Sequence, residues 1–202
     1  MLIAVPGKVL KQAECKARSG SFAVRAGSDG HVDVVLDGLV VAMCGGADLH
    51  EGNPIWDEIL RLSGAIAERG GVIVNGGGEG CMLATARAFP EQTLGIICPP
   101  MTGNAYGPKA VVEDRLTRTG VLTKIPIVIV FEGGVGTIEE WGRALKEIKN
   151  SAADSAPAPK VFLHNYWKKT FDAMWAARVI PKRIMDHVNF FVTAEEVMKL
   201  LQ

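Results

Sequence analysis

The chain has 202 residues, 48% of them hydrophobic and 22% charged, a composition that suits one globular domain with a well-formed core. Its 22 lysines and arginines are balanced by 22 aspartates and glutamates, so no basic field favours nucleic acid or an anionic membrane as a partner. The four cysteines show no C-x-x-C spacing, and we expect neither a metal nor a cofactor. The apolar runs are too short to cross a membrane and the first residues lack a secretory pattern, so we expect a cytoplasmic protein.

Residues 1–38 differ in pattern from the rest of the chain. Turn sequences such as SGS and SDG, together with the alternating HVDVVLDG, predict a small β hairpin or meander. We expect residues 1–38 to form an appendage packed on the sheet of a main domain, which spans residues 39–202.

From residue 39 onward, short apolar runs alternate with segments of helical spacing. The runs do not alternate with polar residues, which is typical of parallel strands buried on both faces. The predicted strands are residues 39–44, 71–74, 94–98, 125–131 and 160–163. This order predicts an α/β fold with a doubly wound, mostly parallel sheet of Rossmann type, in which ligands bind at the carboxyl ends of the strands.

Three stretches predict helices between or after these strands. Ile55, Ile59, Leu62 and Ile66 form an apolar stripe that begins just after Pro54. A second apolar stripe predicts another helix and consists of Ile138, Trp141, Leu145 and Ile148. The last predicted helix begins with the capping-box spacing of Thr193 and Glu196. Residues 151–159 (SAADSAPAP) are interpreted as an exposed loop.

Three strand-to-helix corners are rich in glycine: CGGADLHEGNP (44–54), NGGGEGCML (75–83) and EGGVGTIEE (132–140). Glycine lets the backbone approach a ligand closely, and the amide groups of a helix start attract anions. We therefore expect a phosphate site, although such corners can also be simple tight turns. No corner has the Lys-Ser or Lys-Thr pair of a P-loop, and Cys81 stands where a dinucleotide fingerprint needs its third glycine.

At these corners the sequence resembles the LOG family, the cytokinin-activating nucleoside 5′-monophosphate phosphoribohydrolases, which were often labelled lysine decarboxylases. EGGVGTIEE resembles the family motif PGGxGTxxE, NGGGEGCM resembles GGGxxGLMG, and MCGGADLHEGNP resembles an opening of the form CGSS…P. The resemblance covers about residues 39–202. It implies a homodimer that binds a small-molecule nucleotide, cleaves the N-glycosidic bond of a nucleoside 5′-monophosphate, and releases free base and ribose 5-phosphate.

The resemblance also implies roles for individual residues. Glu140 is the expected catalytic glutamate, with Arg118 as its preferred arginine partner and Arg115 as the alternative. The expected phosphate- and substrate-binding residues are Gly133, Gly134, Gly136, Thr137, Gly76, Gly77, Gly78, Glu79, Met82 and Gly45. Met82 could equally be a core residue.

Several assignments have alternatives. Glu139 stands four residues before Arg143, a natural spacing for a surface ion pair, so we expect it to be structural. Glu140 could merely compensate the helix dipole. Whichever of the two candidate arginines is not catalytic is expected to pair with Glu113 or Asp114.

One position departs from the family pattern. Glu132 replaces the leading proline of the motif, and a carboxylate beside a phosphate site is unfavourable. It could point away from the site or pair with Lys109 or Arg118. This departure keeps open a second hypothesis, a non-catalytic nucleotide sensor or carrier of the same fold. His50 is interpreted as a solvated loop residue, and Tyr106 as part of a possible lid.

Overall fold

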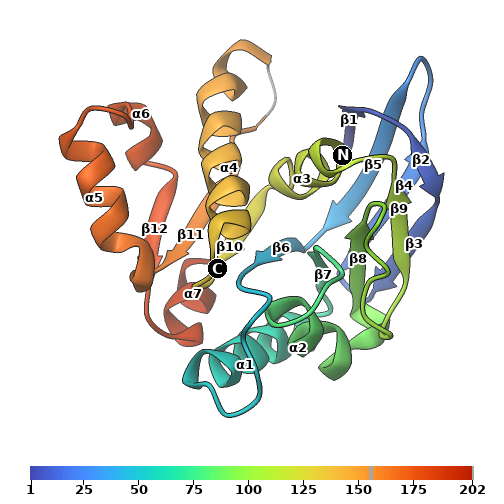
Figure 1. The fold of residues 1–202 in the computed structure, drawn as a ribbon, viewed down its shortest axis with the longest axis horizontal. Helices are drawn as coiled ribbons and strands as arrows, with labels where there is room; N and C mark the ends of the chain where they lie inside the picture. The colour runs from blue at the N-terminus through green and yellow to red at the C-terminus, as the bar shows by residue number, and fades with distance from the viewer. Residues whose placement is uncertain (155–156, 202) are drawn as a thin grey trace.

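The computed structural model describes residues 1–154 and 157–201. Its centre is a sheet of eight strands, seven of which are parallel to one another (Figure 1). These strands are β6 (Val40–Cys44), β7 (Val72–Asn75), β8 (Thr93–Ile97), β9 (Lys109–Val112), β10 (Ile127–Val130), β11 (Lys160–His164) and β12 (Val188–Phe191). The eighth, β2 (Val9–Lys11), pairs antiparallel with β9, and the strand order is β12-β11-β10-β6-β7-β8-β9-β2. The predicted α/β class with a mostly parallel sheet is confirmed.

Helices cover both faces of this sheet. One face carries α1 (Pro54–Glu68), α2 (Cys81–Ala88) and α7 (Ala194–Leu200), whose apolar side chains form a core with Met43, Ile73 and Phe162. On the opposite face lie α3 (Arg115–Thr123), α4 (Val135–Asp154), α5 (Lys168–Ala176) and the short α6 (Lys182–Met185) (Figure 1). Two short 3-10 turns, Pro90–Gln92 and Asn165–Trp167, precede β8 and α5.

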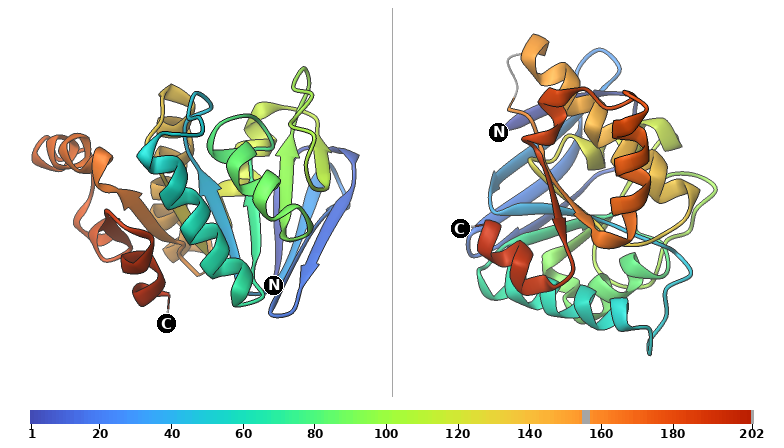
Figure 2. Two further views of the ribbon diagram at one scale, coloured as in Figure 1. Left: turned by 90° about the horizontal axis from the view of Figure 1, so that it is seen from below. Right: turned by 90° about the vertical axis from the view of Figure 1, so that its left-hand side faces the viewer.

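The N-terminal strands form a second sheet, which is wholly antiparallel. It contains β1 (Leu2–Pro6), β3 (Ala13–Ala17), β4 (Gly20–Ala26) and β5 (His31–Gly38) in the order β1-β5-β4-β3. Its buried side chains share one core with β6–β9, so this sheet takes the place of helices over that half of the main sheet (Figure 2). The boundary between an N-terminal appendage and a main domain at residue 38 stays a prediction, because β2 lies before this residue and yet pairs with β9 of the main sheet.

Local signals in the sequence account for several of these elements. All five predicted strands are present, as β6, β7, β8, β10 and β11. Asn53 caps α1 by accepting a hydrogen bond from the amide of Ile55 (2.9 Å), and Pro54 is the first helical residue. The capping box of Thr193 and Glu196 begins α7 as predicted.

The helix predicted from Ile138, Trp141, Leu145 and Ile148 is present as α4. Its last three stripe residues are buried, whereas Ile138, in the first turn, is 43% exposed. One local prediction was wrong. The loop predicted at 151–159 overlaps α4, which continues to Asp154; residues 155 and 156 lie outside the described part of the chain.

The order of the strands positions the site. The chain runs outward from β6 through β7 and β8 to β9, and then returns to β10 on the other side of β6. The direction of winding therefore reverses between β6 and β10, and open α/β sheets bind ligands at the carboxyl ends of strands beside such a point. β8 and β9 are joined by residues 98–108 without a helix, which the sequence pattern did not predict. Within the described residues, no helix combines the length and apolarity that a bilayer crossing requires.

Candidate functional site

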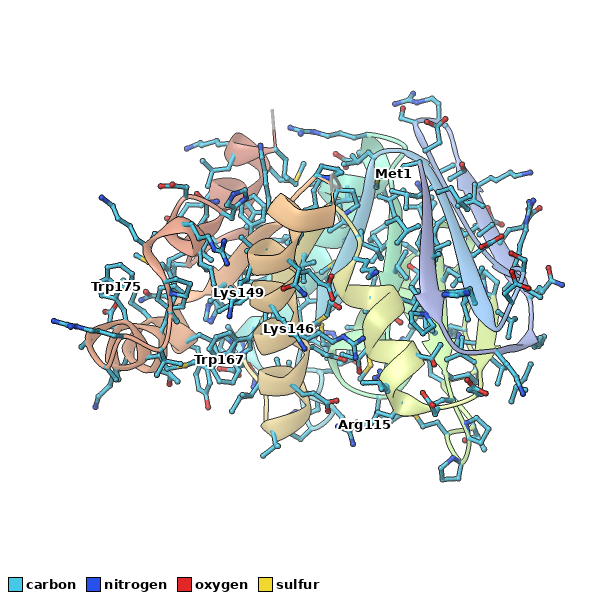
Figure 3. All side chains as sticks on the ribbon, turned by 90° about the horizontal axis from the view of Figure 1, so that it is seen from above. Met1, Arg115, Lys146, Lys149, Trp167 and Trp175 are labelled. Carbon is cyan, nitrogen blue, oxygen red and sulfur yellow. The ribbon has the colours of Figure 1, made fainter. Side chains whose placement is uncertain are left out.

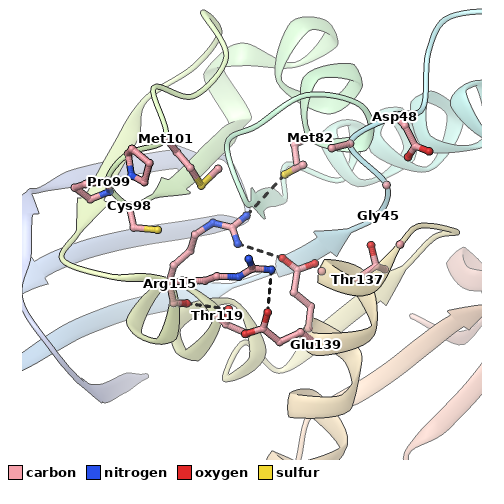
Figure 4. A pocket seen from close by; sticks show the side chains of 17 residues that line it. Gly45, Asp48, Met82, Cys98, Pro99, Met101, Arg115, Thr119, Thr137 and Glu139 are labelled. Atoms are coloured by element: carbon pink, nitrogen blue, oxygen red, sulfur yellow. Dashed lines mark hydrogen bonds and ion pairs between the residues drawn. The ribbon is translucent and has the colours of Figure 1, made fainter.

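A cavity of about 690 Å³ opens at the carboxyl ends of the central strands (Figure 4). Five segments line it: the first glycine corner, the start of α2, the loop that follows β8, part of α3, and the start of α4 with the residue before it. The lining residues are Gly45, Gly46, Ala47, Asp48, Met82, Cys98, Pro99, Pro100, Met101, Arg115, Arg118, Thr119, Gly134, Gly136, Thr137, Glu139 and Glu140.

Arg118 and Glu140 form an ion pair inside this cavity. Nη1 of Arg118 lies 3.4 Å from Oε1 of Glu140, and the side chains are only 9% and 12% exposed. The guanidinium also donates to two backbone carbonyls, from Nε to Ile96 O (2.9 Å) and from Nη2 to Gly76 O (3.1 Å). The arginine is therefore held from three sides with its charge directed at the glutamate.

Burial raises the pKa of Glu140 above its ordinary value, while the Arg118 charge and a hydrogen bond from Cys44 lower it again. The Cys44 thiol has a pKa well above its usual range, because it is buried and lies beside the Glu140 carboxylate. Burial also raises the pKa of Cys81. The raised pKa values favour the neutral form of both thiols, so Arg118 is the charged partner of the carboxylate.

A second, exposed ion pair lies at the cavity mouth and corrects two local predictions. Nη2 of Arg115 lies 3.0 Å from Oε2 of Glu139, with the side chains 64% and 42% exposed. The predicted Glu139–Arg143 pair is wrong, because the first turn of α3 lies beside α4 and brings Arg115 closer (Figure 3), while Arg143 donates to Leu116 O. The predicted pairing of one of the two arginines with Glu113 or Asp114 is also wrong, since Arg115 pairs with Glu139 and Arg118 with Glu140. The Asp114 carboxylate instead caps α3 by accepting from the Thr117 amide (2.7 Å).

The third glycine corner starts α4 beside this pair. A Cβ on Gly133 would overlap the Thr137 side chain and lie 2.7 Å from the backbone nitrogen of Gly46, so the first and third corners touch backbone to backbone. Gly134 has open space around it. Ile138 donates the first intrahelical hydrogen bond, to Gly134 O, and the amides before it have no intrahelical acceptor. This corner therefore presents amide groups to the cavity where Gly134, Gly136 and Thr137 line it.

The second glycine corner is arranged differently. Gly76, Gly77, Gly78 and the exposed Glu79 are not among the lining residues, although the neighbouring Met82 is. The carbonyl of Gly76 holds Arg118, and the first amide of α2, at Cys81, donates to Gly46 O (3.0 Å). Of the predicted residues, the structure brings these to the cavity wall: Gly45, Met82, Arg115, Arg118, Gly134, Gly136, Thr137 and Glu140. Gly133, which packs against Thr137 and the backbone of Gly46, is not part of the cavity lining, and neither is the second corner.

Three parts of the cavity wall were not identified from the sequence. Cys98, Pro99, Pro100 and Met101 form one side of it, and Thr119 and Asp48 lie at other points (Figure 4). A signal for the first of these was present: Cys98 directly follows β8, so it lies at the carboxyl edge where parallel sheets bind ligands.

The remaining candidates lie outside the cavity wall. Neither basic residue considered for Glu132 is its partner, because Arg118 pairs with Glu140 and Lys109 donates to the carbonyls of Tyr106 and Gly107. His50 is exposed and Tyr106 is 40% exposed. Among the described residues, no cluster of three or more histidine, cysteine, aspartate or glutamate side chains is suited to hold a metal ion.

Comparison with known proteins supports the fold. No protein-family model matches the chain, and no curated protein matches it. The X-ray structure of the protein TM1055 matches with a TM-score of 0.58 and 19% identity, over 81% of this chain and 98% of that one. The molybdenum cofactor carrier protein of Chlamydomonas reinhardtii matches with a TM-score of 0.60 and 18% identity, over 81% and 95% of the two chains. The molybdenum cofactor binding protein of Rippkaea orientalis matches with a TM-score of 0.54 and 18% identity, over 81% and 94%.

These likenesses define the class of the protein. It is an α/β protein with a Rossmann-like, doubly wound sheet, and at such identities the matches speak for the fold alone.

Proposed function

We propose that this protein hydrolyses the N-glycosidic bond of a nucleoside 5′-monophosphate and releases free base and ribose 5-phosphate. The observation that carries the proposal is the buried Arg118–Glu140 ion pair, which faces the same cavity as the glycine-rich start of α4. A carboxylate and an anion site a short distance apart are what a phosphorylated sugar with a reactive anomeric carbon requires.

The start of α4 would receive the phosphate. Helix amides without acceptors and the positive end of the helix dipole favour an anion there. Gly134 leaves this approach open, and Arg115 at the mouth adds a cation beside Gly136. The phosphate would compete with Glu139 for this arginine.

Glu140 would act at the sugar. In the reaction, a water oxygen forms a bond to C1′ as the bond from C1′ to the base nitrogen breaks, and the electron pair of that bond leaves with the base. Water supplies one proton to the base and the hydroxyl to the sugar, so the reaction needs no other reactant. The transition state resembles an oxocarbenium ion, and an ionised carboxylate stabilises it and orients the water. Burial raises the pKa of Glu140, and the charge of Arg118 lowers it and so favours this ionised form.

The test is a product assay with matched variants. Purified protein is incubated with AMP, CMP, GMP, UMP and IMP, and free base is measured by chromatography. We expect base from at least one nucleotide, its loss in Glu140→Gln, and its retention in Glu139→Gln, because only Glu140 is buried beside Arg118. Base release that survives in Glu140→Gln and disappears in Glu139→Gln would transfer the catalytic role to Glu139.

A second candidate is binding without turnover, as in a carrier. Two observations favour it: Glu132 stands where the resembling family has proline, and two of the similar solved structures are named as molybdenum cofactor carrier or binding proteins. Titration of the five nucleotides, and of molybdenum cofactor, distinguishes the two candidates, since a carrier binds its ligand and leaves it unchanged.

The proposal includes a cytoplasmic homodimer. Analytical ultracentrifugation tests the dimer, and a sedimentation coefficient of a single chain at micromolar concentration would contradict it.

A further inference from the structure

The loop of residues 98–108, between β8 and β9, supplies a cavity wall of a distinct chemical kind. Cys98, Pro99, Pro100 and Met101 line the cavity with apolar and sulfur-containing groups. The ionic groups facing the same space come from α3, α4 and the first corner. A ligand bound here therefore meets charge on one side and a soft, apolar surface on the other.

Asn104 holds this loop in place. Its side chain donates from Nδ2 to Gly78 O (2.7 Å) and accepts from the Tyr106 amide at Oδ1 (3.1 Å), and its own amide donates to Gly77 O (2.7 Å). The residue is only 8% exposed. Asn104 thus joins the loop to the second glycine corner through side chain and backbone together.

The loop and the corner are packed closely along this contact. Gly103 has a φ of +72°, and a Cβ there would lie 3.2 Å from Gly77 O. A Cβ on Gly78 would lie 3.3 Å from Cε of Met82 and 3.7 Å from Cε of Met101, so the two thioether side chains converge over this glycine. Two carbonyls of the second corner therefore hold parts of the cavity in place. Gly78 O accepts from Asn104, which anchors the apolar wall, and Gly76 O accepts from the cationic Arg118.

We propose that Asn104 is a positioning residue that fixes the wall of Pro99, Pro100 and Met101 as the surface that receives the base of the nucleotide. This inference rests on the proposed function. A planar heteroaromatic base fits such a wall, because thioethers make favourable contacts with aromatic rings and a proline pair offers a flat apolar surface. Asn104 lies outside the cavity lining and acts on the base through the loop that it anchors.

The first test compares two probes that differ only in the base. Asn104→Ala removes the hydrogen bonds to Gly78 O and from the Tyr106 amide, and leaves Arg118, Glu140 and the start of α4 unchanged. Affinities are measured by calorimetry with Glu140→Gln present in every protein, so that AMP is bound without being cleaved, and we expect Asn104→Ala to lower the affinity for AMP by about three- to tenfold. The affinity for ribose 5-phosphate, which shares sugar and phosphate with AMP, stays within a factor of two of the protein with the native Asn104.

The control is Thr193→Ala, which removes the cap of α7 outside the cavity lining. We expect it to lower the melting temperature while both affinities stay unchanged. Equal affinities for AMP with and without Asn104→Ala, or equal losses for AMP and ribose 5-phosphate, would overturn the assignment of the wall to the base.

The second test does not depend on any ligand. Amide hydrogen exchange of the free protein, followed in peptides that cover residues 101–108, becomes faster in Asn104→Ala and is unchanged in Thr193→Ala if Asn104 anchors the loop. Unchanged exchange in Asn104→Ala would overturn the anchoring. A wild-type protein that binds neither AMP nor ribose 5-phosphate would refute the proposed function and the base assignment, and the exchange result would still decide the role of Asn104.

Discussion

The energetic coupling between Arg118 and Glu140 can be measured with a double-mutant cycle. The variants are Arg118→Met, Glu140→Gln and the two combined, and the quantity compared is the free energy of unfolding. Gln keeps an oxygen that accepts from the guanidinium, and Met keeps much of the length of the arginine. The bonds from Arg118 to Gly76 O and Ile96 O are lost in both arginine variants, so their contribution cancels in the cycle.

The expected magnitudes follow from distance and burial. At an effective dielectric constant of about 20, two charges separated by the observed 3.4 Å attract by about 5 kcal/mol, part of which offsets the desolvation of both groups. Arg118→Met leaves Glu140 buried without its cation and should destabilise the protein by about 3–5 kcal/mol. We expect a coupling energy of about 2 kcal/mol.

The same two helices provide the control cycle. Arg115 and Glu139 are paired at 3.0 Å but are 64% and 42% exposed, so their coupling should be below about 1 kcal/mol. Urea unfolding followed by tryptophan fluorescence measures all variants under identical conditions. Equal couplings in the two cycles, or a coupling below about 0.5 kcal/mol for Arg118 and Glu140, would refute the reasoning that burial makes this pair strong.

Three further predictions follow from the site. Gly133→Ala should destabilise the protein by about 1–3 kcal/mol, because the added Cβ would lie 2.7 Å from the backbone nitrogen of Gly46. Gly134→Ala should change stability by less than about 0.5 kcal/mol and weaken AMP binding. Urea unfolding measures the stabilities and calorimetry the binding. Burial raises the pKa of Glu140 in the folded state, so the folded protein binds this proton more tightly than the unfolded chain does. The contribution of Glu140 to the free energy of unfolding therefore falls as pH rises from the ordinary glutamate range through the raised pKa. Glu140→Gln should flatten this part of a urea-midpoint profile, and an unchanged slope would contradict the shift. The thiols of Cys44 and Cys81, whose pKa values are raised by burial, should resist iodoacetamide at pH 8 in the folded protein and react in urea; rapid labelling without urea would contradict their burial.

Five strands of the main sheet could be predicted from the sequence, because they are short apolar runs that are buried on both faces. Local hydrophobic pattern and capping residues determine such elements, as Asn53 and Thr193 illustrate at the starts of α1 and α7. The helix-free connection between β8 and β9 was not predictable in this way. The antiparallel N-terminal sheet covers that part of the main sheet, and this is a long-range arrangement that no local pattern carries.

Some of the residues that line the cavity were candidates already from the sequence, either in a glycine-rich corner at a strand end or, for Arg118, in the helix before β10. Arg118, Glu140, Gly134 and Thr137 lie together at the cavity, although their catalytic and binding roles stay predictions. The partner of Glu139 was assigned wrongly, because an i,i+4 spacing describes one helix and cannot show that α3 lies beside it.

The wall of Cys98–Met101 was missed for a related reason. Its side chains carry no charge that would mark them as functional in the sequence, and their position depends on hydrogen bonds from Asn104 to a corner more than twenty residues earlier in the chain.

The most direct test of the account is a crystal structure of Glu140→Gln with AMP, in which the variant is expected to bind the nucleotide without cleaving it. We expect the phosphate within hydrogen-bonding distance of the amides at the start of α4, C1′ beside residue 140, and the base against Pro99, Pro100 and Met101. A phosphate bound elsewhere, or a C1′ facing away from residue 140, would contradict the proposed function.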